Sequence, residues 1–153
     1  MDQTWRKIAV LAVGGLTEVG FAPGSDHLLV VSHQGRGLLD CRTGERVARD
    51  DDEGFGWFDS ARRVARAIGP LAGLEIEVAG LSGGVLPTAT PDGWRAEAVA
   101  GGVVLTGPGG DRLEVDDPED LRAFGFSPDG RFFVVATSPT LHLYGRAGLT
   151  PGR

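Results

Sequence analysis

Two stretches of this chain have nearly the same pattern, about 105 residues apart. In the first, Leu16–Phe21 is followed by a Pro-Gly turn and by the apolar run His27–Ser32. In the second, Leu121–Phe126 is followed by Ser-Pro-Asp-Gly and by the apolar run Phe132–Ala136. A repeated strand–turn–strand unit cannot bury its apolar face alone, so it must stack on others. This repeat predicts a mainly β protein of stacked antiparallel meanders.

The spacing of turn residues supports this class. The chain contains 25 glycines and 9 prolines among 153 residues, which is typical of many tight turns. We expect one β-rich domain over residues 1–153, with about a dozen short strands. We expect residues 7–13 to pair with the last strand, 140–144, and so to join the two ends of the sheet system.

One segment has a helical pattern. Asp59 or Ser60 is positioned to cap it, and Ala61, Val64, Ala65 and Ile68 fall on one face at helical spacing. Gly69-Pro70 would end it. The sequence therefore predicts one short helix near residues 59–68.

The two turns carry a resemblance to a known family. Phe21-Ala22-Pro23-Gly24 and Phe126-Ser127-Pro128-Asp129-Gly130 resemble the turn between the second and third strands of WD40-like and related β-propeller blades. The segments 39–45 and 143–145 resemble the end of the third strand. The resemblance implies a binding platform. A WD40 blade takes about 40–45 residues, so the chain has room for about three. Three arrangements stay open: a sandwich or barrel of blade-like meanders, an open partial propeller that dimerises, or a shrunken propeller.

Charge and composition indicate which classes of partner and which cellular compartment to expect. The net charge is -6 and no basic stripe is visible in the sequence, so we expect no binding to nucleic acid or to anionic membranes. The single Cys41 cannot form an internal disulfide, which favours a reducing compartment, here the cytoplasm. The excess of arginine over lysine and the absence of asparagine indicate a high-GC bacterial genome.

An acidic segment with neighbouring aromatics is the first candidate site. Asp50, Asp51, Asp52 and Glu53 are followed by Phe55 and Trp57. The consecutive acids do not match a calcium loop, which alternates ligands with spacers. The acids are either a solvated loop or a docking site for a basic partner, and the aromatics are either a core plug or an exposed contact point.

A second candidate is a serine. Gly80-Leu81-Ser82-Gly83-Gly84 fits the G-x-S-x-G pattern of a nucleophile turn, with Asp92 or Asp111 and then His142 in the expected order. The following Pro-rich stretch does not predict the helix that such a turn needs. We expect no metal site, because the three histidines and one cysteine lack ligand spacing, and no cofactor.

The sequence thus favours a non-enzymatic protein-interaction module of the bacterial cytosol. One form of this hypothesis is an immunity-like protein that masks a basic partner by charge complementarity. The alternatives are a small serine hydrolase using Ser82 and a structural or assembly subunit, with a homodimer as one possible state.

Overall fold

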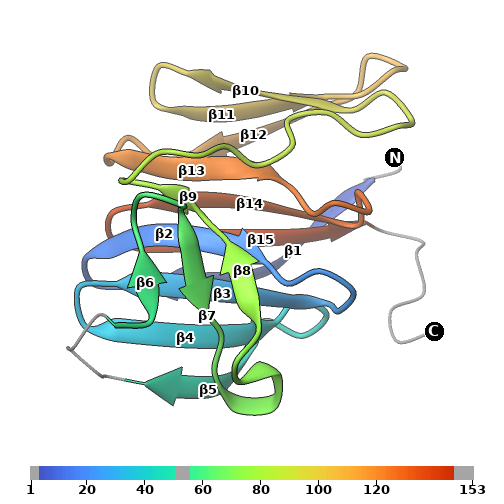
Figure 1. Cartoon of the computed structure of the whole chain (residues 1–153). Coiled ribbons are helices and arrows are strands. Elements are labelled where there is room, and N and C mark those ends of the chain that lie inside the picture. The colour runs from blue at the N-terminus through green and yellow to red at the C-terminus, as the bar shows by residue number, and fades with distance from the viewer. Residues whose placement is uncertain (1–3, 51–55, 147–153) are drawn as a thin grey trace.

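The described residues form antiparallel sheets joined by turns and loops, as the repeat predicts. The structure is a computed structural model and describes residues 4–50 and 56–146. Fifteen strands form four sheets, and within the described ranges there is no α-helix, only a 3-10 turn at Gly69–Leu71 (Figure 1). No helix of the described residues is long and apolar enough to cross a membrane.

The first repeat forms the sheet that we call the repeat-1 sheet. Its strands lie in the order β5-β4-β3-β2-β9, so four consecutive strands make a meander and a short fifth strand is added at the inner edge. The bounds are β2 Leu16–Phe21, β3 His27–Ser32, β4 Gly35–Asp40, β5 Glu45–Asp50 and β9 Ala79–Gly80.

The second repeat forms the repeat-2 sheet, in the order β1-β15-β14-β13. The bounds are β13 Leu121–Phe126, β14 Phe132–Thr137, β15 Thr140–Arg146 and β1 Trp5–Ala12. Strand β1 pairs with β15, with Lys7 opposite Tyr144 and Ala12 opposite Thr140. The prediction that the first strand joins the last is therefore confirmed. An N-terminal strand completes a sheet whose other strands lie at the C-terminal end of the chain.

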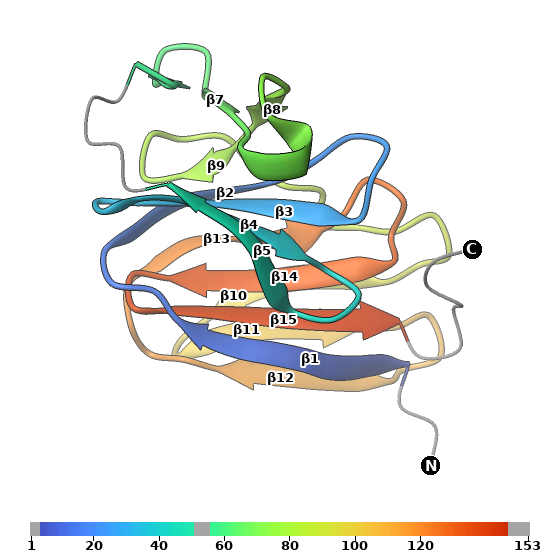
Figure 2. The same cartoon turned by 90° about the horizontal axis from the view of Figure 1, so that it is seen from below.

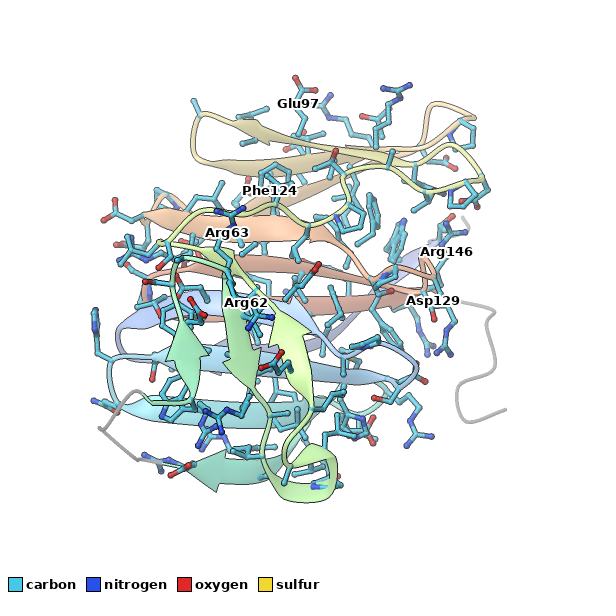
Figure 3. The ribbon with its side chains drawn as sticks, viewed as in Figure 1. Arg62, Arg63, Glu97, Phe124, Asp129 and Arg146 are labelled. Carbon is cyan, nitrogen blue, oxygen red and sulfur yellow. The ribbon has the colours of Figure 1, made fainter. Side chains whose placement is uncertain are left out.

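Two three-stranded sheets cover the outer faces of the repeats. One contains β6 Phe58–Asp59, β7 Val64–Arg66 and β8 Glu75–Glu77, and the other contains β10 Arg95–Val99, β11 Gly102–Thr106 and β12 Arg112–Asp116. Figure 2 shows the β6–β8 sheet on one side of the repeat-1 sheet and the repeat-2 sheet on the other. In the second of these sheets β10 and β11 form an antiparallel hairpin, and β12 pairs with the other edge of β11.

Corresponding faces of the two repeats point the same way along this stack. Leu28 and Val30 of β3 pack against the repeat-2 sheet, and their counterparts 105 residues later, Phe133 and Val135, pack against the β10–β12 sheet. Leu29 packs against the β6–β8 sheet, and its counterpart Val134 packs against the repeat-1 sheet. The repeats are therefore stacked head to tail. The described residues do not close into a ring.

The helix predicted near 59–68 is wrong. Residues 60–63 form a turn, with Arg63 at a φ of 55°, and the chain returns as β7 beside β6. Asp59 Oδ1 accepts the Arg62 N–H at 3.1 Å, so the predicted cap closes a hairpin turn instead. Ala65 and Ala67 are buried against the repeat-1 sheet at the two-residue period of a strand. Tertiary packing selected the strand period over the helical one.

Candidate functional site

The Ser82 loop is a glycine-built turn fixed to the start of β2. Gly80 and Gly83 bridge each other, and both have positive φ values. The Leu81 N–H donates to Thr17 O at 2.9 Å, and the Ser82 N–H donates to the buried Glu18 carboxylate at 2.7 Å. Burying a carboxylate requires such hydrogen bonds, so Glu18 anchors this loop structurally. The Ser82 residue is exposed on the loop.

The other members of the proposed triad have different partners. His142 Nε2 lies 2.8 Å from Asp117 Oδ2. Asp92 accepts two hydrogen bonds from Arg146, at 2.6 and 2.7 Å, and one from Thr90, and the Arg146 bonds hold the pKa of Asp92 well below its usual range. No hydrogen bond of the described residues joins the Ser82 side chain to an aspartate or a histidine. The structure does not bring the triad together.

Asp50 and Trp57 lie at the junction of the repeat-1 sheet and the β6–β8 sheet. The Asp50 carboxylate is ion-paired with Arg36, whose side chain is only 8% exposed. Arg36 also donates to Arg66 O at 2.7 Å and lies 4.5 Å from the centre of the Trp57 ring. Trp57 is 6% exposed and packs in the core, as the core-plug alternative expects. The predicted residues Asp51, Asp52, Glu53 and Phe55 lie outside the described residues.

A buried polar network holds the loop between β12 and β13. Asp117 Oδ2 accepts a hydrogen bond from Thr137 Oγ1 at 3.0 Å, and it also forms a hydrogen bond with His142 Nε2. Burial alone would raise the pKa of Asp117, but its bonds to His142, the Glu119 N–H and Thr137 outweigh burial and lower it. Sequence reasoning did not find this network, because its three residues are spread over 26 positions and share no motif. It fixes the loop without being exposed.

The loop that this network fixes presents unpaired acids at one end of the strands. Asp116, Glu119 and Asp120 have no ion-pair partner among residues 4–50 and 56–146. The Asp117 N–H donates to Gly101 O at 2.9 Å, which ties the loop to the β10–β11 turn. The Ser138 N–H donates to Asp120 O at 2.9 Å, which ties it to the β14–β15 turn. These turns lie together on the left in Figure 1.

Two apolar side chains are exposed beside these acids. Val99 is the last residue of β10 and is 44% exposed. It pairs with Gly102 of β11, and Gly102 pairs in turn with Asp116 of β12. Leu121 follows Asp120 directly and is 39% exposed. We call Asp116, Glu119, Asp120, Val99 and Leu121 the acidic end. It combines exposed carboxylates with two exposed apolar side chains, and both kinds of group occur at protein interfaces.

The remaining sequence candidates have structural roles. His27 Nδ1 lies 3.1 Å from Ser25 Oγ in the first repeat turn. Burial raises the pKa of the fully buried Cys41 thiol, which makes this group unreactive at neutral pH. In the described part of the chain, no three His, Cys, Asp or Glu side chains are grouped closely enough to hold a metal ion.

Sequence comparison adds no family to this description. A scan against protein-family models finds no match, and a search of curated proteins finds no matching relative. The function must therefore be argued from the surface of this chain itself.

Proposed function

We propose that this protein is a non-enzymatic protein-interaction module of the bacterial cytosol that binds a basic protein through its acidic end. In this proposal the two stacked repeats are blade-like units that serve as a rigid platform. The observation that carries the proposal is the set of exposed carboxylates at Asp116, Glu119 and Asp120, which have no ion-pair partner among the described residues and lie at the same end of the strands as exposed Leu121 and Val99.

Physical reasons favour a protein partner over a small ligand. The three carboxylates lie close together along the chain and repel each other, which disfavours the folded state. A bound partner with positive charges would relieve this repulsion. The loop is held at both sides by backbone hydrogen bonds and beneath by the Asp117–His142 pair. Its carboxylates are thus presented in fixed positions, which reduces the entropy lost on binding.

The partner class follows from this chemistry. Exposed carboxylates without ion-pair partners complement a lysine- or arginine-rich protein surface, and the exposed Val99 and Leu121 can contact apolar atoms of the same partner. Such a module would mask a basic surface, as an immunity-like protein does. The acidic segment Asp50–Glu53 stays a second predicted contact for the same partner. The Ser82 hydrolase has no contact between Ser82 and a base to support it.

Charge-matched variants test the proposal. The binding variant is Asp116→Asn with Glu119→Gln and Asp120→Asn. The control is Glu45→Gln with Glu77→Gln and Asp111→Asn, which removes three exposed carboxylates that also have no ion pair among the described residues. Both variants change the net charge equally, so only the position of the charges differs.

The measurement is capture from a bacterial lysate at about 50 mM and 300 mM salt, with identification of the captured protein. We expect a basic protein to be retained at low salt by the wild type and the control, and to be lost from the binding variant. Salt should weaken capture because exposed charges are screened. Equal capture by all three proteins, or a captured protein that is not basic, would contradict the proposal.

A further inference from the structure

A pocket with an apolar floor and an arginine rim opens between the outer strands of the two repeat sheets. It encloses about 240 Å³. Its floor is formed by apolar residues from both sheets, among them Leu11 of β1, Val30 of β3, Leu39 of β4 and Leu141 of β15. The strands β1 and β5, which flank it, lie on the side of the molecule that Figure 2 presents. We call it the outer pocket.

The outer pocket exists because one position of β4 has no side chain. Gly37 lies two residues before Leu39 and on the same face of the strand, toward the repeat-2 sheet. A Cβ placed on Gly37 would find only Arg46 Nε within 4 Å, at 3.7 Å. The backbone at Gly37 does not have a positive φ. A larger residue would therefore fit the backbone and fill the hollow.

Two guanidinium groups stand at its rim without partners. Arg46 lies opposite Leu39 in the β4–β5 pairing, and Arg49 lies opposite Gly37. Neither arginine has an ion pair or a side-chain hydrogen bond with another described residue. Arg36 and Asp50 also line the pocket, and they compensate each other as an ion pair. The outer pocket therefore carries two uncompensated positive charges in a chain whose net charge is -6.

Two further polar groups line the same mouth. Gln34 and Ser32 lie at the β3–β4 turn, where Ser32 Oγ accepts the Gln34 N–H at 3.2 Å. The Gln34 side-chain amide has no hydrogen bond with another described residue and can donate to a bound group. The arrangement offers charged and neutral donors at the rim and aliphatic side chains at the floor.

We propose that the outer pocket binds a small carboxylate with an apolar body, of about six carbon atoms. Guanidinium groups bind carboxylates through paired N–H donors, which matches Arg46 and Arg49 at the rim. The size follows from the volume, since a water molecule occupies about 30 Å³ and the pocket therefore holds about eight non-hydrogen atoms. Hexanoate has this size and chemistry. This site is independent of the acidic end.

The test uses hexanoate as the probe and 1-hexanol as its uncharged counterpart. Titration followed by NMR of the backbone amides should shift the signals of residues around Gly37 and Arg49, and the affinity for hexanoate should exceed that for hexanol at least tenfold. Arg46→Gln with Arg49→Gln should weaken hexanoate binding at least tenfold. Arg95→Gln with Arg112→Gln, which removes two exposed arginines from the β10–β12 sheet, should leave it unchanged.

A filling variant gives an independent readout. Gly37→Val should abolish binding of hexanoate, while thermal unfolding shows that the fold is retained. The proposal is overturned if hexanoate does not bind, if hexanol binds equally well, or if neither variant weakens binding. Binding of the peptide acid Ala-Ala-Leu without binding of hexanoate would also overturn it and would identify a peptide C-terminus as the ligand.

Discussion

The two repeats fold alike at their turns and differ in their outermost strands. In the first turn the Ala22 N–H donates to His27 O at 2.9 Å, and in the second the Ser127 N–H donates to Phe132 O at 2.8 Å. The fourth strand of the repeat-1 sheet, β5, is the next segment of the chain and has no buried residue. The fourth strand of the repeat-2 sheet, β1, comes from the other end of the chain and buries Trp5.

This difference shows that local sequence fixes the hairpin, while the neighbouring layers fix what is buried. Trp5 packs on Phe126 and Phe133 of its own sheet and on Trp94, which precedes β10 of the covering sheet, at ring distances of 5.5–6.3 Å. Strand β5 has no such neighbour, so its exposed face stays charged and forms the rim of the outer pocket. An equivalent position in a repeat can thus become a structural anchor or a binding surface.

The largest expected effect separates these two outer strands. Trp5→Ala should lower the free energy of unfolding by about 3–5 kcal/mol, because it leaves a cavity among large aromatic rings. Val47→Ala in β5 should change it by less than about 0.5 kcal/mol, because Val47 is 44% exposed. Urea unfolding followed by tryptophan fluorescence and by circular dichroism measures both. Similar losses for the two variants would mean that β5 is as strongly anchored as β1.

Strands β2 and β13 should be destabilised to a similar extent by an added methyl group, because another segment of the chain lies close to a glycine in each of them. A Cβ on Gly20 would lie 2.2 Å from Glu77 O, and one on Gly125 would lie 2.6 Å from Pro87 O. Gly20→Ala and Gly125→Ala should each lower the free energy of unfolding by about 1–3 kcal/mol through overpacking. Gly37→Ala is the control, with an expected change within about 0.5 kcal/mol. A large effect at only one of the two inner positions would break their equivalence.

The turns differ by one hydroxyl, which gives a smaller effect. Ser127 Oγ accepts the Phe132 N–H at 3.0 Å and donates to Asp129 at 2.7 Å, whereas the first repeat has Ala22 at this position. Ser127→Ala should cost about 1 kcal/mol, because it leaves the buried Phe132 N–H without this partner. Ala22→Ser should change stability by about 0.5 kcal/mol or less. Thermal unfolding of both variants measures the difference, and equal responses would contradict it.

The smallest expected effect depends on pH. Arg42 hydrogen-bonds to Asp40 in the first repeat, at 3.1 and 3.2 Å, and these bonds lower the pKa of Asp40 although burial opposes them. The second repeat has Gly145 at the corresponding position. A carboxyl with a lowered folded-state pKa stabilises the fold above its unfolded pKa of about 3.9. That contribution is lost as the pH falls through the folded pKa.

The corresponding measurement compares urea unfolding at pH 6 and pH 3. The wild type should lose more stability over this interval than Asp40→Asn, which cannot titrate at this position. Parallel losses in the two proteins would show that the Arg42 contact contributes nothing to folding.

Much of the fold was predictable because the repeats encode it locally. Alternating apolar residues bounded by Pro-Gly turns predicted the strands, and the pairing of 7–13 with 140–144 followed from the need to cover a sheet edge. The β6–β7 hairpin was not predictable, because the apolar residues of this segment also fit the spacing of a helix near 59–68. Only the burial of Ala65 and Ala67 against the repeat-1 sheet decides between them.

The candidate sites were less predictable than the fold. The acidic end and the outer pocket each combine residues from separate strands, such as Val99 with Leu121, or Gly37 with Leu141. A short stretch of sequence does not show that residues from separate strands will be neighbours in the fold. For Trp57 the sequence left a core plug and an exposed contact point open, and only its burial to 6% exposure in the folded protein decides for the core.

The sequence by itself determined the class of the fold, because a strand and its turn depend on residues only a few positions apart. The tertiary structure decided which strand completes each sheet, which faces are buried and which charged groups are left without partners. These outcomes depend on contacts between segments far apart in the chain, such as the ion pair between Asp26 and Arg131, which are 105 residues apart. Such contacts form only when the layers stack, so no shorter stretch of the chain contains them.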